Sequence, residues 1–189
     1  MFNANIIEDV LSKEDCSYLI DTVKNIEPWQ DGGSDFWNNR SLNGEHLYNN
    51  FDKKAGLILY NLRFTIAQHI KTFYKEDQIF PDLTQIVRWF PGMEQSPHCD
   101  DMTNYDVPEM AEFKTRNYGA ILYLNDDYFG GKTYYPNYNF EITPKAGMLA
   151  IHPGDPDHLH GVTKIENSTR YTIASFWTKS SNKFDGWTI

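Results

Sequence analysis

Residues 140–177 read FEITPKAGMLAIHPGDPDHLHGVTKIENSTRYTIASFW, and this stretch decides the fold. Short runs of β-branched and aromatic residues alternate in it with turns rich in Gly, Pro and Asn, which is typical of antiparallel strands. Similar runs lie upstream, and many short strands joined by such turns indicate an antiparallel barrel or a double-sheet jelly roll. The predicted strands are 86–90, 118–124, 132–135, 140–143, 148–152, 160–165 and 169–177.

The chain before these strands has the periodicity of helices. Ser12 is a candidate N-cap, with Asp15 in a position like that of a capping box, and a helix is predicted over 13–25. A longer helix is predicted over 52–74, a stretch without proline. The region 27–50 holds Pro, Gly and several Asn, and is predicted to form turns with at most one short strand.

The order of these elements predicts the fold class. Helices come first and strands second, which indicates an α+β fold. We expect a double-stranded β-helix (jelly-roll) core over about 81–180, buttressed by a helical N-terminal part over about 1–80. A length of 189 residues suits one domain spanning 1–189.

Composition excludes several classes of function. The formal net charge is −9, whereas a nucleic-acid-binding protein needs a basic face to neutralise phosphates. Two cysteines do not make a disulfide scaffold. The chain shows neither the pattern of a signal peptide nor an apolar run long enough to span a bilayer. We expect a cytoplasmic protein with no nucleic-acid and no membrane partner.

The pair His98 and Asp100 is a candidate half of a metal site. Alternate side chains of a strand point to the same face, so this spacing aims an imidazole and a carboxylate into one space. A second histidine from a distant strand would complete the facial triad of non-haem Fe(II) oxygenases. Such pairs also arise by chance as surface ion pairs, so the pair alone is weak evidence.

Two downstream histidines compete for the third ligand position. His160 lies ten residues before Arg170, and on neighbouring antiparallel strands both side chains could face one cavity. A dicarboxylate co-substrate needs this arrangement, because one end chelates the metal and the far carboxylate requires a buried cation such as arginine. We prefer His160, while His158 stays an alternative and His152 is interpreted as a residue at a strand end.

Six short motifs occur in a fixed order around these residues. In this order and spacing they resemble the catalytic domain of the prolyl 4-hydroxylase and prolyl-hydroxylase-domain branch of the 2-oxoglutarate oxygenases. The resemblance covers about 87–177, roughly half of the chain. The motifs are His98-Cys99-Asp100, Tyr123-Leu124-Asn125, Gly130-Gly131-Lys132-Thr133, Pro144-Lys145-Ala146-Gly147, His160-Gly161-Val162 and Thr169-Arg170-Tyr171.

The resemblance implies a cofactor and its ligands. It implies that Fe(II) is bound by His98, Asp100 and His160, and that Arg170 pairs with the distal carboxylate of 2-oxoglutarate. It implies 2-oxoglutarate and O2 as co-substrates, with ascorbate as a candidate reductant. We expect no catalytic side chain beyond the metal centre.

The resemblance also implies further contacts to 2-oxoglutarate. Tyr123 would hydrogen-bond its distal carboxylate, and Thr133 and Thr172 are candidate contacts. Trp89 stands where family members usually have a tyrosine. Because indole is only a donor, the hydroxyl contact of that tyrosine is missing or is made elsewhere.

The substrate implied by the resemblance is a prolyl residue in a peptide or protein. Arg40 and its neighbour Ser41 look like an Arg-Ser pair of a substrate loop, although a surface loop with a solvated arginine fits equally well. Phe176 falls where the family often has a substrate-facing Trp, and Trp177 follows one place later, so both are candidate substrate contacts. The segment 101–116 is a candidate lid.

Other functions stay open at this point. The chain could be a 2-oxoglutarate oxygenase that acts on another residue or on a free small molecule. It could be a non-catalytic jelly-roll metal-binding module. It could also be a cupin-like metal enzyme without 2-oxoglutarate, in which Arg170 has a purely structural role.

Overall fold

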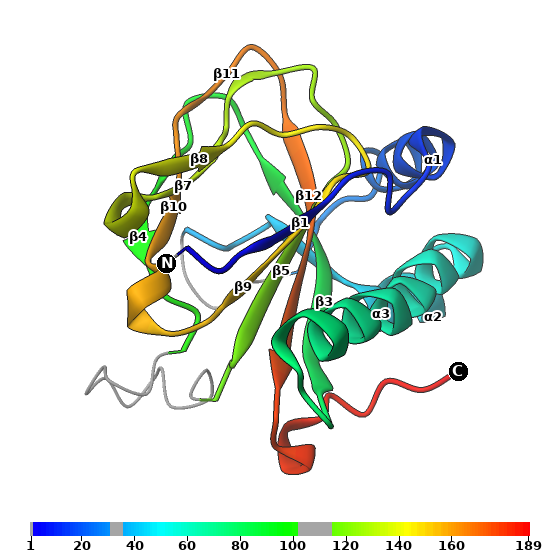
Figure 1. The fold of residues 1–189 in the computed structure, drawn as a ribbon. Coiled ribbons are helices and arrows are strands. Elements are labelled where there is room, and N and C mark those ends of the chain that lie inside the picture. Colours follow the sequence, from blue (N-terminus) through cyan, green and yellow to red (C-terminus); the bar gives the residue numbers. More distant parts are fainter. Residues whose placement is uncertain (1, 31–35, 102–114) are drawn as a thin grey trace.

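Two antiparallel sheets face each other in the computed structural model, which describes residues 2–30, 36–101 and 115–189 (Figure 1). The larger sheet contains β1 (Asn5–Ile7), β2 (Ser41–Asn43), β3 (Phe80–Trp89), β5 (Tyr118–Tyr123), β9 (Leu149–Pro153) and β12 (Arg170–Thr178). The smaller sheet contains β4 (Gln95–His98), β7 (Thr133–Tyr135), β8 (Phe140–Ile142) and β10 (His160–Val162). Two short strands, β6 (Phe129–Gly130) and β11 (Ile165–Glu166), form a separate pair.

The strand order is that of a jelly roll. The larger sheet runs β1-β9-β5-β12-β3-β2 and the smaller sheet runs β4-β10-β7-β8. Apart from the consecutive pair β7 and β8, neighbouring strands are far apart in sequence, so each sheet collects strands from both halves of the strand-rich region. The predicted α+β fold with a double-stranded β-helix core is confirmed.

Three helices flank the larger sheet: α1 (Lys13–Val23), α2 (Gly44–Asn50) and α3 (Lys53–Tyr74). The side chain of Ser12 caps α1 by accepting from the backbone N–H of Asp15, as the sequence predicted. The prediction of turns over 27–50 was wrong for α2, where Asn43 caps a helix that begins with glycine. Among the described helices, none combines the length and apolar character that crossing a membrane requires.

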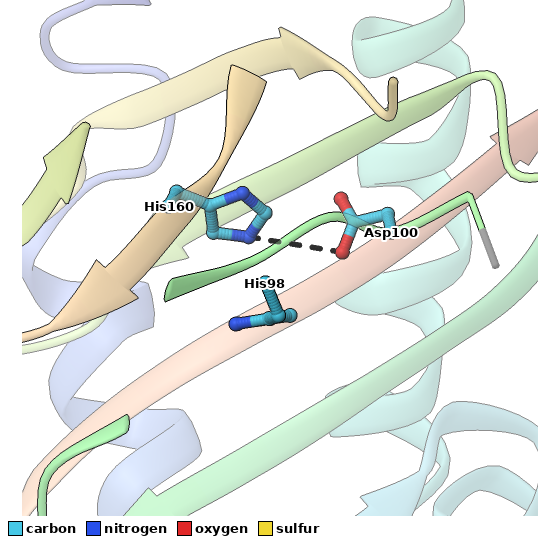
Figure 2. A group of neighbouring side chains, drawn as sticks. All are labelled: His98, Asp100 and His160. Carbon is cyan, nitrogen blue, oxygen red and sulfur yellow. Dashed lines mark ion pairs between the residues drawn. The ribbon is translucent and has the colours of Figure 1, made fainter. Parts of the chain in front are cut away.

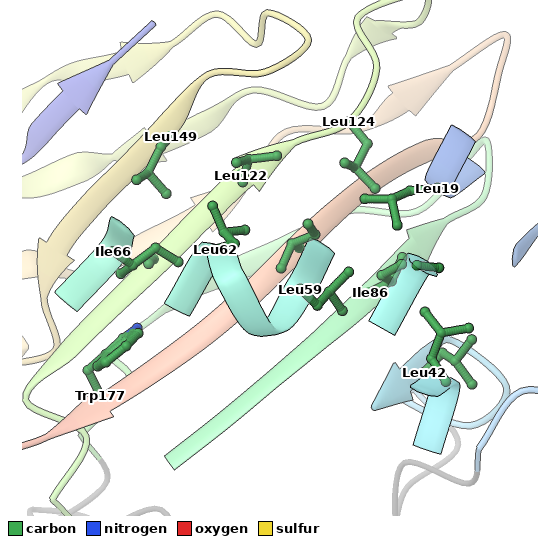
Figure 3. Close-up of a cluster of buried hydrophobic side chains, with 14 of the residues drawn as sticks. Leu19, Leu42, Leu59, Leu62, Ile66, Ile86, Leu122, Leu124, Leu149 and Trp177 are labelled. Atoms are coloured by element: carbon green, nitrogen blue, oxygen red, sulfur yellow. The ribbon is translucent and has the colours of Figure 1, made fainter. Parts of the chain in front are cut away.

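The main core lies between α3 and the outer face of the larger sheet (Figure 3). Leu59, Leu62 and Ile66 of α3 pack in one cluster with Leu122 of β5 and Leu149 of β9. Each fully buried aliphatic side chain of this kind contributes roughly 1.5–3 kcal/mol. Because this face is closed by apolar packing, the opposite face of the sheet is left for a cavity.

Strand β12 divides its side chains between the core and the cavity. Thr172 and Phe176 line the cavity, whereas Ile173 and Trp177 lie in the apolar core. The predicted substrate contact at Trp177 was wrong: its side chain is 1% exposed among the core residues. The alternation of a strand decides this, because the neighbour of a cavity-facing residue points to the other face.

Candidate active site

Three potential metal ligands meet at the cavity (Figure 2). His98 ends β4, Asp100 follows two residues later, and His160 begins β10, directly opposite His98 in the pairing of the two strands. Their ligand atoms all lie within 4.8 Å of one another. The predicted strand stops at His98, so Asp100 is positioned by the loop that follows, where the N–H of Asp101 donates to the carbonyl of Gly154 (2.8 Å).

The second ring nitrogen of each histidine already has a protein partner. Nδ1 of His98 lies 3.1 Å from the carbonyl oxygen of Ser96, and Nδ1 of His160 lies 3.1 Å from that of His158. A carbonyl only accepts, so Nδ1 carries the proton in both rings and the lone pair belongs to Nε2. This is the orientation found in metal-binding histidines.

The protonation states of Asp100 and His160 also suit the binding of a cation. Burial alone would raise the pKa of Asp100, but the imidazole of His160, which is protonated at acidic pH, and a hydrogen bond from His152 outweigh it and hold the pKa well below its ordinary value. Burial, with a smaller effect from the neighbouring imidazole of His152, lowers the pKa of His160 to about 3. At neutral pH the site therefore offers a carboxylate and a neutral imidazole, which are the forms that bind metals.

The structure distinguishes His158 from His160, the two candidates for the third ligand position. His158 lies in the short 3-10 helix η3 (Pro156–His158), where its Nδ1 is 2.7 Å from Oδ1 of Asp155. It does not belong to the group formed by His98, Asp100 and His160. The candidate preferred from the sequence is thus the one that the fold brings to the site.

His152, interpreted from the sequence as a strand-end residue, contacts the site directly. It is fully buried in β9, its Nε2 lies 3.1 Å from Oδ2 of Asp100, and its ring centroid is 4.2 Å from that of His160. It pairs across the sheet with Gly119, where a Cβ atom would collide with both Asp100 and His152. Only the pairing of β5 with β9 shows this, and no local pattern signals it.

Arg170 lies at the start of β12, opposite Trp89 of β3. Its side chain is 1% exposed, and within the described part of the chain its Nε and Nη2 have no hydrogen-bond partner. A buried cation without an anion costs several kcal/mol. The arrangement therefore favours an anionic ligand, which fits the distal carboxylate of 2-oxoglutarate.

Further polar groups surround Arg170. The hydroxyls of Tyr123 and Thr133 lie 2.7 Å apart, and the guanidinium carbon is 5.4 Å from the ring centroid of Tyr123. The hydroxyl of Tyr128 is buried and unpartnered among the described residues, as is Nε1 of Trp89. Sequence reasoning missed Tyr128. Burial raises its pKa to about 12 despite the opposing charge of Arg170, so it keeps a proton that it can donate.

The metal group of His98, Asp100 and His160 lies in the same cavity as Arg170, and this cavity has a volume of about 530 Å³. Phe176 lines it, as expected for a substrate contact, and the guanidinium of Arg116 lies 3.8 Å from the Phe176 ring centroid. Residues 102–114 of the candidate lid lie outside the described residues. The described lining also includes Trp37, Leu83, Gln85, Val87, Trp89, Ile121, Val162, Thr172 and Ala174.

Arg40 has a different place from the one expected. It is 1% exposed, and its guanidinium carbon lies 4.1 Å from the Trp89 ring centroid and 4.8 Å from that of Trp37. Its Nε donates to the carbonyl of Arg88 (3.2 Å) and its Nη1 to that of Phe36 (2.8 Å). A side chain buried in this way packs behind the cavity wall, which corrects the expectation of a direct substrate contact.

Comparison with known proteins defines the class. The chain matches the sequence profile of the 2OG-Fe(II) oxygenase superfamily over residues 84–178, just over half of its length. The chain therefore belongs to this superfamily. The matched region contains all three residues of the metal group and Arg170.

Particular relatives are more distant. A protein of Acanthamoeba polyphaga mimivirus described as a candidate prolyl 4-hydroxylase is 30% identical over 105 residues, which is 49% of this chain and 43% of that protein. Human procollagen-lysine,2-oxoglutarate 5-dioxygenase 2 is 25% identical over 197 residues, 93% of this chain and 25% of that one. The chain thus spans less than half the length of these curated relatives.

Solved structures share the fold. The viral collagen prolyl hydroxylase of Paramecium Bursaria Chlorella virus-1 has a TM-score of 0.71 at 16% identity, covering 95% of this chain and 97% of that chain. The Trichoplax adhaerens prolyl hydroxylase, solved with a peptide of hypoxia inducible factor, has a TM-score of 0.73 at 17% identity, covering 97% and 86%. At such identities the likeness concerns the fold.

Proposed function

We propose that this chain is an Fe(II)- and 2-oxoglutarate-dependent dioxygenase that hydroxylates a C–H bond. The observation that carries the proposal is the buried guanidinium of Arg170, whose Nε and Nη2 have no hydrogen-bond partner among the described residues, in the same cavity as the group formed by His98, Asp100 and His160. A metal enzyme without a dicarboxylate co-substrate would not require a buried cation there. A non-catalytic module would not require it either.

Each residue has a defined part in this proposal. His98, His160 and Asp100 would hold Fe(II) through Nε2, Nε2 and a carboxylate oxygen. Arg170 would bind the distal carboxylate of 2-oxoglutarate, with Tyr128 donating a hydrogen bond. When loaded, the iron centre couples the conversion of 2-oxoglutarate and O2 to succinate and CO2 with the transfer of one oxygen atom to the substrate.

Further side chains would enclose the co-substrate. Trp89 and Thr172 line the cavity next to Arg170, while Tyr123 and Thr133 form a hydrogen-bonded pair beside it. Together they would orient 2-oxoglutarate and exclude water from the reacting end. Exclusion of water strengthens each electrostatic contact within the cavity.

The substrate that we propose is a prolyl residue in a peptide or protein. The described lining of the cavity exposes mainly apolar surface, with the neutral polar side chains of Gln30, Asn43 and Gln85 beside it, and Asp100 is its one carboxylate. Arg116 adds a positive charge near Phe176, although Asp82 pairs with it at 2.8 Å. An uncharged, compact ring suits such a lining better than a cationic side chain does.

A lysyl residue is the second candidate substrate. It is supported by the extent of the match, because the procollagen-lysine dioxygenase aligns along 93% of this chain. A lysyl ammonium group would need an acidic partner, and the two carboxylate oxygens of Asp100 already face His152 and His160. For this reason we propose a prolyl residue in preference to a lysyl residue.

A matched peptide panel tests the proposal. Peptides that differ only in carrying Pro, Lys or Ala at one position are incubated with the protein, Fe(II), 2-oxoglutarate and O2, and mass spectrometry locates any added oxygen atom. We expect addition on proline alone. Addition only on lysine would establish the second candidate, and oxidation only of free amino acids would reject a peptide substrate.

A further inference from the structure

A series of buried polar side chains, joined by hydrogen bonds, ends at Asp100 of the proposed metal site. It consists of Tyr135 of β7, His152 of β9 and Asp100, three residues from separate parts of the fold. The Tyr135 hydroxyl lies 2.9 Å from Nδ1 of His152, whose Nε2 lies 3.1 Å from Oδ2 of Asp100. Tyr135 and His152 are both fully buried. Their hydrogen bonds are therefore protected from competition by water.

The chemistry of the end groups sets the direction of the hydrogen bonds. The Asp100 carboxylate only accepts, so Nε2 of His152 donates to it. In a neutral imidazole the other nitrogen then accepts, and the Tyr135 hydroxyl is the donor beside it. Burial raises the pKa of Tyr135 well above its ordinary value, so the hydroxyl keeps its proton.

The two carboxylate oxygens of Asp100 face different partners. Oδ2 is bound by His152, whereas Oδ1 lies 3.7 Å from Nε2 of His160, on the side of the other proposed ligands. Gly119 closes the arrangement, because any Cβ at that position would collide with Oδ2 of Asp100 and with Nε2 of His152. The carboxylate is thus fixed by contacts on its far side.

We propose that His152, held in one tautomer by Tyr135, is a positioning residue that reserves Oδ2 of Asp100 and leaves Oδ1 as the single metal-binding oxygen. This inference rests on the metal role of Asp100 in the proposed function. A carboxylate that binds the metal through one oxygen occupies one coordination position, whereas a carboxylate that binds through both oxygens occupies two. His152 would thereby keep a position open for the co-substrates.

Cobalt(II) binding to the metal-free protein, measured without 2-oxoglutarate, tests the proposal. His152→Leu removes the donor, whereas His152→Gln keeps an amide donor near the Nε2 position. We expect His152→Leu to weaken cobalt(II) binding about 10–100-fold and to change the cobalt absorption spectrum, as loss of an outer partner of a metal ligand does. His152→Gln should recover most of the affinity and the spectrum.

Two results would overturn the proposal. One is a His152→Leu variant with the affinity and spectrum of the unmodified protein. The other is an equal loss in the Leu and Gln variants, because the donor would then not matter. Thermal unfolding of the metal-free variants identifies a folding defect.

Tyr135→Phe is the second variant, in case His152→Leu does not fold. It keeps the ring and removes the proton donor to Nδ1. We expect about 2–10-fold weaker cobalt(II) binding, the range of one hydrogen bond. Unchanged affinity in Tyr135→Phe would overturn the proposed setting of the tautomer.

A protein that binds cobalt(II) in a His152-dependent way but forms no succinate would refute the proposed function and leave this inference standing.

Discussion

The two ends of the cavity differ in how their polar groups are satisfied. At the end formed by His98, Asp100 and His160, the second polar atom of each side chain has a protein partner. At the end formed by Arg170, two guanidinium nitrogens and the hydroxyl of the nearby Tyr128 are buried and have no partner among the residues that the structure describes. One end is complete as a ligand set, and the other is complete only with an anion.

This difference indicates what each end does. Fixed second atoms hold the first atoms of a metal site in place before the metal arrives. Unpartnered buried donors cost free energy in the empty protein, and that cost is recovered when a ligand with matching acceptors binds. We therefore expect substitutions at the first end to affect metal binding, and substitutions at the second end to affect co-substrate binding alone.

The largest effect is expected at His160. His160→Ala removes a proposed ligand and should abolish metal-dependent turnover, measured as succinate formed per unit time. His158→Ala is the matched control, because His158 lies two residues away and outside the metal group, and it should keep most of the activity. Loss of activity in His158→Ala with retention in His160→Ala would reverse the assignment.

Among substitutions at the co-substrate end of the cavity, the largest effect is expected at Arg170. Arg170→Gln removes the cation, and we expect the KM for 2-oxoglutarate to rise roughly 100-fold, as when one partner of a buried charged pair is lost. Cobalt(II) affinity, measured without 2-oxoglutarate, should stay unchanged. An equal loss of metal affinity would show that the two ends are not independent.

The pH dependence of the free energy of unfolding tests whether His160 is neutral in the folded protein. The pKa of His160 is about 3 in the folded protein and about 6.5 in an unfolded chain, so the unfolded chain binds more protons between these values. The free energy of unfolding of the metal-free protein should therefore fall as pH drops below about 6.5, by up to about 1.4 kcal/mol per pH unit from this residue.

His160→Gln isolates that contribution. Its denaturant midpoints, followed from pH 7 to acidic pH, should decline less steeply than those of the unmodified protein. Parallel declines in the two proteins would mean that His160 is not held neutral by its surroundings.

The smallest effect is expected at Tyr128. Tyr128→Phe deletes one donor beside Arg170 and should raise the KM for 2-oxoglutarate about 2–10-fold, the range of one hydrogen bond. Tyr134→Phe is the control, because its hydroxyl lies 3.5 Å from the carbonyl of Gln95, and both residues belong to the smaller sheet, whereas Arg170 belongs to the larger one. Similar KM values for both variants would remove Tyr128 from the co-substrate site.

The sequence predicted the strands and helices whose signals are local. The cap at Ser12, the helix over 53–74 and most strands of the core follow from periodicity and turn residues. The short helix α2 did not, because Gly44 opens it and its seven residues carry little periodicity. Trp177 was expected at the cavity because it is the tryptophan next to the family's substrate-facing position, but the alternation along β12 turns it into the core.

The site was predictable only where its residues form motifs. His98, Asp100, His160 and Arg170 lie in short patterns with fixed spacing, and the fold brings them to one cavity. His152 could not be predicted, since its contact with Asp100 depends on strand pairing between segments far apart in sequence. Partners of this kind are set by the fold.

The most direct test of the central claim is succinate formation with a peptide substrate under matched omissions. We predict that succinate appears only when Fe(II), 2-oxoglutarate and O2 are present together, and that it disappears in His160→Ala. Metal binding without any 2-oxoglutarate-dependent succinate, in the presence or absence of the peptides, would contradict the assignment of this chain as a 2-oxoglutarate oxygenase.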